Sequence, residues 1–171
     1  KSRYPIITTV MSNIGLENFI LNNFKINLKR SSVGDINVIK EMQKHDSILG
    51  GEQSGHIILS QYSKTGDGIL AALKVTEIMS KVKKSASSLF NLYENFPQIK
   101  INIPYKKISK NSLKYIKNLN KKKLKDKNMR LLLRLSGTEP LIRILVEGKN
   151  LKSVEEQAKI IEKNIRSKIE K

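Results

Sequence analysis

Residues 6–28 read IITTVMSNIGLENFILNNFKINL, and this stretch decides the fold class. Residues 6–11 are rich in β-branched side chains, as is typical of a strand. Ser12 and Asn13 can begin a helix, and the apolar side chains that follow recur at helical spacing: Leu16, Phe19, Ile20 and Phe24. Residues 26–28 alternate between apolar and polar, which indicates a second strand. The stretch therefore predicts a strand, a helix and a strand in succession.

The alternation of strands and helices continues downstream. Asp35 is placed to cap a helix that carries Val38 and Met42. Residues 57–59 form a strand after a glycine-rich turn, and residues 65–68 are a loop and cap for the next helix. That helix is expected to bury one apolar face: Ala71, Val75, Ile78 and Val82. Strands that alternate with helices predict an α/β domain of three layers with a largely parallel sheet.

The pattern changes near Pro97, where the second half of the chain begins. Residues 99–103 alternate in the manner of an edge strand, which agrees with the proline at position 104, since proline cannot donate to a sheet. Residues 131–135 and 142–146 also alternate. They predict an antiparallel hairpin with one apolar face.

Two helices complete the predicted second half. One lies in the lysine-rich stretch 109–128, and the other carries an apolar stripe that is more typical of a core than of a partner surface: Val154, Ala158, Ile161, Ile165 and Ile169. We therefore expect a truncated three-layer α/β domain over residues 1–97. A small α+β domain with an antiparallel sheet and two helices follows over residues 98–171. The chain runs from a non-Met residue straight into a strand-like segment, which indicates that it begins inside a longer protein.

The composition narrows the class of protein. The chain has 171 residues and no cysteine, which excludes disulfides, thiol nucleophiles and cysteine-ligated metals. The absence of cysteine leads us to expect a cytoplasmic protein. No apolar run approaches the roughly 20 residues of a membrane span, so we expect no membrane contact. The net charge of +18 raises nucleic acid as a ligand. We favour a lysine-rich surface instead, because lysine, isoleucine and asparagine are abundant together and aromatic residues make up only 5%.

The first candidate loop is the 50–56 loop, Gly-Gly-Glu-Gln-Ser-Gly-His. Paired glycines let a backbone turn tightly and approach a ligand. In an extended loop, Glu52 and Ser54 would point the same way and offer a carboxylate and a hydroxyl to adjacent sugar hydroxyls. An ordinary glycine-rich turn remains the alternative. His56 is either a general acid or base or a residue that braces the loop, and we favour the second role.

The second candidate loop is the 134–143 loop, Arg-Leu-Ser-Gly-Thr-Glu-Pro-Leu-Ile-Arg. Two strands deliver Arg134 and Arg143 to the two sides of one turn, which also offers hydroxyls and free amides. Amides that converge form an anion site, and arginine presents a planar fork that matches phosphate. Glu139 counts against an all-positive pocket, and it either orients an arginine or caps the turn. We favour a phosphate site over a hairpin with surface arginines.

These two loops resemble the sugar-binding and phosphate-binding loops of the α-D-phosphohexomutases. The motifs Thr9–Glu17, Val33–Asp35 and Thr65–Ile69 are similar to the branch that acts on glucosamine phosphate. The resemblance covers nearly the whole chain and is weakest over residues 106–128. It implies a four-domain enzyme, of which this chain is most of the third domain and all of the fourth.

The resemblance also implies roles for individual residues. The residues implied to hold the sugar are Glu52, Ser54, Gly34, Asp35 and His56. The residues implied to hold the phosphate that is not reacting are Arg134, Ser136, Gly137, Thr138 and Arg143. No residue of the chain matches the family's catalytic phosphoserine loop or its three-aspartate magnesium loop, so no catalytic or metal-binding residue is predicted here.

The implied function belongs to the whole enzyme. It would interconvert glucosamine 6-phosphate and glucosamine 1-phosphate through a phosphoserine and a bisphosphate. Magnesium would be bound outside this chain, whose partners are the hexosamine phosphate and the missing N-terminal domains. The chain alone is expected to be inactive. A phosphomannomutase/phosphoglucomutase is the alternative within the family, and a basic nucleic-acid-binding module is the alternative outside it.

Overall fold

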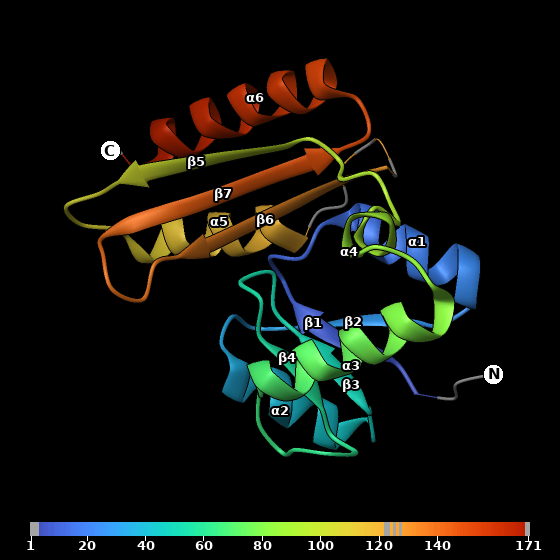
Figure 1. Ribbon diagram of the computed structural model, residues 1–171. Coiled ribbons are helices and arrows are strands. Elements are labelled where there is room, and N and C mark those ends of the chain that lie inside the picture. The colour runs from blue at the N-terminus through green and yellow to red at the C-terminus, as the bar shows by residue number, and fades with distance from the viewer. Residues whose placement is uncertain (1–3, 122–123, 125, 127, 170–171) are drawn as a thin grey trace. The chain divides into compact units, whose positions relative to one another are not determined.

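The computed structural model describes residues 4–121, 124, 126 and 128–169 (Figure 1). The chain divides between Asn95 and Phe96 into two compact units, here called the first unit and the second unit. Each unit has its own sheet and its own hydrophobic core.

The first unit contains a four-stranded mixed sheet. Its strands are β1 (Ile6–Thr9), β2 (Leu28–Ser31), β3 (Leu49–Gly51) and β4 (Ile57–Leu59), in the order β2-β1-β3-β4. β1 is parallel to both β2 and β3, and β4 is antiparallel to β3. The prediction of an α/β domain with a largely parallel sheet is therefore confirmed.

Four helices accompany this sheet. They are α1 (Ile14–Phe24), α2 (Asp35–Lys44), α3 (Gly68–Val82) and the short α4 (Ala86–Phe90). Asn13 caps α1 as expected, because its Oδ1 accepts a hydrogen bond of 2.8 Å from the amide of Gly15. The prediction that Asp35 caps α2 is wrong by one residue. Gly34 is the cap, with a φ of 113° that favours glycine, and Asp35 is the first helical residue.

The two faces of the first sheet are covered differently. α2 packs on one face and forms a core with Ile7, Val38, Met42 and Ile58. α1 lies toward the other face, where its Leu16 and Ile20 line a hollow. Ile6 and Thr8 of β1 also line this hollow, because side chains alternate along a strand and Ile7 between them points to the α2 face.

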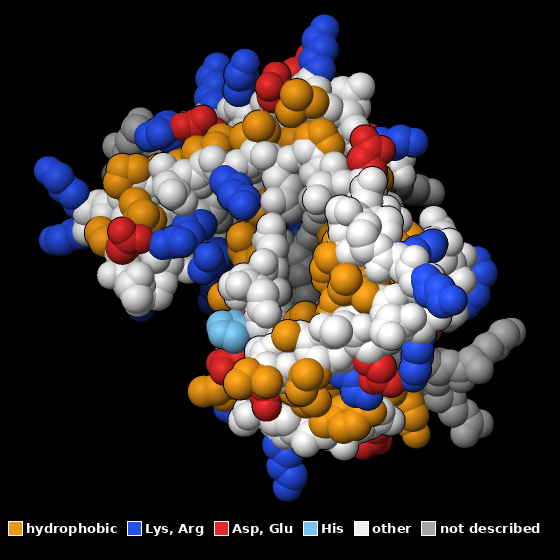
Figure 2. Space-filling view, in the orientation of Figure 1, with side chains coloured by type: hydrophobic (Ala, Val, Ile, Leu, Met, Phe, Trp, Pro, Cys, Tyr) orange, Lys and Arg blue, Asp and Glu red, His pale blue; other side chains and the backbone are white. Residues whose placement is uncertain are grey.

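The expected burial of α3 is not seen. None of its residues is buried, and Ile78 and Val82 are each 48% exposed. α3 contacts the edge strand β4, so its apolar face has few neighbours among the described residues. Figure 2 shows hydrophobic side chains gathered at the surface in the region of α3. Helical spacing predicted which side chains share a face, but it could not tell what covers that face.

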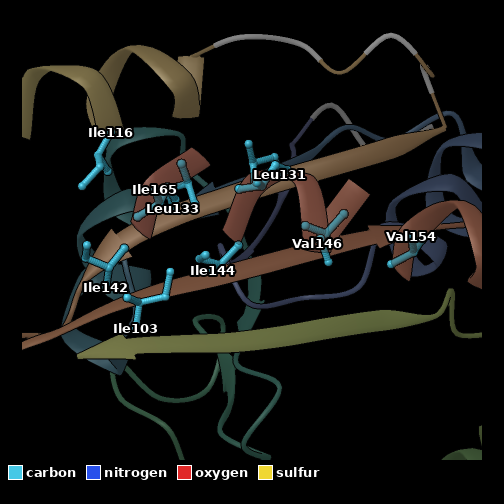
Figure 3. Close-up of a cluster of buried hydrophobic side chains, with 11 residues drawn as sticks. Ile103, Ile116, Leu131, Leu133, Ile142, Ile144, Val146, Val154 and Ile165 are labelled. Carbon is cyan, nitrogen blue, oxygen red and sulfur yellow. The ribbon is translucent and has the colours of Figure 1, made fainter. Parts of the chain in front are cut away.

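The second unit is an antiparallel α+β unit, as predicted. Its elements are β5 (Gln98–Pro104), α5 (Lys110–Lys121), β6 (Met129–Leu135), β7 (Leu141–Gly148) and α6 (Leu151–Ile169), and the strand order is β5-β7-β6. One face of the sheet packs against α5 and α6 in a core of isoleucine, leucine and valine (Figure 3). Residues 122–123, 125 and 127 of the predicted lysine-rich stretch lie outside the described residues.

A buried ion pair crosses the second sheet at the end where β7 finishes. Glu147 is fully buried, and its carboxylate accepts hydrogen bonds of 2.5 Å from both Gln98 Nε2 and Arg130 Nε. These three residues lie opposite one another in register on β5, β7 and β6. The strand pattern alone placed Glu147 at an ordinary polar position, so this tie between all three strands was not foreseen.

Candidate functional site

The 50–56 loop lies where the connections of the first sheet diverge. β1 leads through α1 to β2 on one side, and β2 leads through α2 to β3 on the other side. The carboxyl ends of these three parallel strands face the same edge, so residues 10–13, 32–34 and 52–55 gather there. In open α/β sheets, ligands bind outside the carboxyl ends of the strands at such a switch point.

The 50–56 loop is a tight hairpin between β3 and β4. The amide of Glu52 donates to the carbonyl oxygen of His56 at 2.9 Å, and the amide of Gly55 donates to that of Glu52 at 3.1 Å. The premise of an extended loop is therefore wrong, because residues 52–55 form a turn. One of the paired glycines serves packing: a Cβ at Gly50 would clash with Met42 Sδ and lie 2.9 Å from Val38 Cγ1.

Glu52 joins this hairpin to the loop before α2. Its side chain is only 10% exposed, and its Oε1 accepts a hydrogen bond of 2.9 Å from the amide of Gly34. Its Oε2 lies 3.5 Å from His56 Nδ1, and Ser54 Oγ lies 3.4 Å from the same nitrogen. The structure thus brings Gly34, Glu52, Ser54 and His56 together. Asp35 is exposed, and its Oδ1 accepts from the amide of Ile36 at 2.8 Å.

This group of side chains can recognise hydroxyls. Glu52 Oε2 is an acceptor, Ser54 can donate or accept, and the mostly exposed imidazole of His56 can do either according to its tautomer. A hollow of about 470 Å³ is lined by Glu52 and His56 at one end and extends along the face of the sheet toward Leu16 and Ile20. The arrangement suits a polar ligand that is held at one end of this hollow.

The end of β1 and the loop that follows it contain buried polar residues that the sequence did not single out as a site. Thr8, Thr9, Ser12 and Asn13 are all buried, and the hydroxyls of Thr8 and Ser12 are hydrogen-bonded to each other. Arg30 of β2 holds this loop to α1, because it donates to Glu17 Oε2 at 2.5 Å and to the Ser12 carbonyl oxygen at 3.4 Å. The sequence could not predict the pairing of Arg30 with Glu17 of α1, because these two residues are 13 positions apart and belong to no common motif.

The 134–143 loop connects β6 and β7 of the second unit. Arg134 and Arg143 lie directly opposite each other in the antiparallel register, on the face away from the buried Leu133 and Ile144. Like charges at opposed positions destabilise a strand pair. Burial, followed by the neighbouring positive charge of Arg143, lowers the pKa of Arg134 from its ordinary value. The arrangement therefore favours the binding of an anion.

Glu139 supplies a negative charge to this loop. Its Oε2 accepts a hydrogen bond of 2.7 Å from Arg143 Nη2, so it orients an arginine, which was one of the two roles expected for it. Arg143 Nε is buried and has no hydrogen-bond partner among the described residues. Thr138 and Gly137 are exposed and Ser136 is half-buried, and a Cβ added at Gly137 would meet nothing within 4 Å. Gly137 does not use a positive φ here, so its backbone does not require glycine.

Within the described ranges, no group of three histidine or acidic side chains could hold a metal ion. The described residues therefore offer no site for the magnesium ion, which the family resemblance places outside this chain. No helix among the described residues is long and apolar enough to cross a membrane.

Two family models match this chain. Residues 1–96 match the family model described as phosphoglucomutase/phosphomannomutase, alpha/beta/alpha domain III. The chain belongs to this family. Residues 72–164 match the model of the C-terminal domain of the same family, so the 50–56 loop and the 134–143 loop fall within successive domains of a phosphohexomutase. The family expected from the sequence motifs is confirmed, and the nucleic-acid-binding alternative is not favoured.

Curated relatives agree with this assignment. The chain is 42% identical over 171 residues to a phosphoglucosamine mutase of Fusobacterium nucleatum, with 94% of this chain and 37% of the relative covered. It is 44% identical over 161 residues to a phosphoglucosamine mutase of Campylobacter jejuni strain RM1221, with 93% and 36% covered. The chain therefore spans little more than a third of the length of these relatives, and it corresponds to the C-terminal part of a phosphohexomutase.

Solved structures show the same fold. An N-acetylglucosamine-phosphate mutase in its substrate complex superposes with a TM-score of 0.69 at 19% identity, covering 96% of this chain and 39% of the other. A phosphoglucomutase/phosphomannomutase family protein from Burkholderia thailandensis gives a TM-score of 0.74 at 16% identity, with 96% and 37% covered. At these identities the comparison supports the fold alone.

Proposed function

We propose that this chain is the substrate-binding C-terminal part of an enzyme that interconverts glucosamine 6-phosphate and glucosamine 1-phosphate. In this proposal residues 1–97 are the third domain and residues 98–171 the C-terminal domain. The reaction passes through a phosphoserine and a bisphosphate intermediate, and it serves amino-sugar nucleotide and cell-wall precursor synthesis in the cytoplasm. The printed names of the relatives at 42–44% identity favour glucosamine over glucose or mannose phosphates.

The opposed pair of arginines is the observation that carries the proposal. Two half-buried guanidinium groups face each other across β6 and β7, and one nitrogen of Arg143 is buried without a partner among the described residues. A phosphate offers several oxygens to both guanidinium groups and removes their repulsion. Ser136, Gly137 and Thr138 add hydroxyl and amide donors from the same turn.

The 50–56 loop supplies the sugar contacts in this proposal. Glu52 is held in place by the amide of Gly34 and keeps Oε2 for a sugar hydroxyl, while Ser54 and His56 offer further donors or acceptors. Asp35 lies at the start of the helix that follows Gly34. A buried, oriented carboxylate accepts hydroxyl hydrogen bonds more strongly than a neutral acceptor, which suits sugar recognition.

We place the reacting serine and the magnesium ion in the remainder of the polypeptide. The sequence of this chain has no Ser-His-Asn run and no cluster of three aspartates. The part played by this chain is to bind the sugar and the phosphate that does not react, and to hold both in a fixed orientation. We expect no turnover of glucosamine phosphate by this chain alone.

Titration of the isotope-labelled chain tests the proposal. Inorganic phosphate should shift the amide resonances of residues 134–143, and glucosamine 6-phosphate should shift these and also residues 50–56. Arg134→Ala should abolish the response to inorganic phosphate. Unchanged binding in that variant would reject the phosphate site, whereas a sugar phosphate that leaves residues 50–56 unaffected would reject the sugar site.

A further inference from the structure

One of the two arginines of the 134–143 loop, Arg143, is paired with a carboxylate of the same loop, that of Glu139. Glu139 lies in the turn between β6 and β7 and Arg143 lies on β7, and Arg143 Nη2 donates to Glu139 Oε2 at 2.7 Å. Both side chains remain partly exposed, so a ligand from solvent can reach this contact. Arg134 lies opposite and has no comparable hydrogen bond to a carboxylate among the described residues.

A carboxylate and a phosphate compete for the same guanidinium donors. Arg143 can present Nε together with one Nη to two oxygens of a single anion. In this structure Glu139 engages Nη2 alone, and Nε stays buried without a partner within the described part of the chain. The carboxylate therefore satisfies Arg143 only in part, and a phosphate that took both nitrogens would have to displace it or share the guanidinium with it.

We propose that Glu139 is an internal competitor that occupies Arg143 when phosphate is absent and is displaced when phosphate binds. The proposal rests on the phosphate-binding role proposed above for Arg134 and Arg143. Glu139 has two effects on the free loop. It offsets the repulsion between the opposed arginines, and it keeps the affinity of the loop for phosphate moderate.

This exchange of anions explains why an acidic residue lies in a loop that binds phosphate. An exposed ion pair shifts an equilibrium by up to about fivefold, so Glu139 can be displaced by a phosphate at moderate concentration. The displaced carboxylate remains on the same short turn and repels the bound phosphate, which favours its release. A loop that must hold a phosphate in one step and release it in another gains from such a competitor.

The test compares Glu139→Gln with the unaltered chain. Glutamine keeps the shape of the side chain and removes its charge. The affinity for inorganic phosphate, measured by calorimetry or NMR titration at constant ionic strength, should rise about two- to fivefold, and phosphate should dissociate correspondingly more slowly. Glu155→Gln removes an equal charge from an exposed position on α6, and it should leave the affinity within about 1.5-fold.

The direction of the change separates competition from support. If Glu139 merely held Arg143 in position for the ligand, Glu139→Gln would weaken phosphate binding, and this result or an unchanged affinity would overturn the proposal. The side-chain NMR signals of Arg143 give a second readout: phosphate should alter its Nε signal in both proteins, but only the unaltered chain should lose a pre-existing carboxylate contact at Nη. Arg134→Ala tests the site itself. Phosphate binding that survives in that variant contradicts the proposed function. If only the expected gain in affinity of Glu139→Gln is missing, the competitor proposal is wrong and the proposed function is unaffected.

Discussion

The Arg134→Gln variant should melt at a higher temperature than the unaltered chain without phosphate, and at a lower temperature than the unaltered chain with phosphate. Arg134 and Arg143 are opposed on β6 and β7, and like charges there destabilise the strand pair by roughly 0.2–1 kcal/mol. Glu139 offsets part of this repulsion, so we expect Arg134→Gln to gain about 0.5 kcal/mol. For a chain of this length that gain raises the melting temperature by about 1–2 °C in phosphate-free buffer.

Phosphate should raise the melting temperature of the unaltered chain but not that of the Arg134→Gln variant. A ligand at ten times its dissociation constant stabilises the folded state by about 1.4 kcal/mol, which corresponds to roughly 3–6 °C. The variant lacks one of the two guanidinium groups and should gain little. The unaltered chain therefore melts below the variant without phosphate and above it with phosphate.

Circular dichroism or scanning fluorimetry over a phosphate titration would measure this crossing, with ionic strength held constant by chloride. Lys152→Gln removes the same charge from an exposed position on α6 and should follow the unaltered chain in both buffers. If Arg134→Gln melts below the unaltered chain without phosphate, Arg134 serves the fold rather than a ligand. Equal stabilisation of both proteins by phosphate would refute the assignment of the site.

Three further predictions concern the fold and its charges. Gly50→Ala should destabilise the first unit by about 1–3 kcal/mol, because the added methyl group meets Met42 in the core; chemical denaturation would measure this, and an unchanged midpoint would contradict the packing described. Glu147→Ala should cost the second unit about 3 kcal/mol in denaturation, because it leaves a largely buried arginine without its carboxylate; a loss below about 1 kcal/mol would show that solvent replaces the carboxylate. Two lysine side chains of α3 that donate to Glu77 lower its pKa to about 2, so its contribution to stability is complete above the ordinary value of 4.5 and is lost as the pH falls toward 2. Carboxyl-carbon NMR should find this low pKa, and Lys81→Gln should raise it.

The sequence predicted those features that depend on local periodicity and on turn chemistry. Alternating leucines and isoleucines around residues 136–140 were enough to predict the β6–β7 hairpin, and with it the convergence of Arg134 and Arg143. The strand–helix alternation of residues 6–59 likewise led to the correct class of sheet. These patterns are physical consequences of side chains that must alternate across a strand or recur along a helix face.

Features that depend on contacts between distant segments were not predictable. The hydrogen bond from Gly34 to Glu52 joins two loops 18 residues apart, and the tie between Arg30 and Glu17 joins β2 to α1. The exposed face of α3 is a miss of the same kind, because spacing along one helix carries no information about its neighbours. The sequence identified the loops proposed here as the candidate site, but it could not predict the hydrogen bonds between distant loops, such as the bond from Gly34 to Glu52.

The bond between the Gly34 amide and Glu52 has an evolutionary consequence. A residue other than glycine at position 34 would strain a backbone with φ of 113°, and it would redirect the amide away from the carboxylate. Substitutions at the two positions are therefore expected to be epistatic, with a joint effect that differs from the sum of the single effects. A substitution in one loop would therefore disturb the other loop, so variants that change both loops together should be recovered more readily from a library than the single changes suggest.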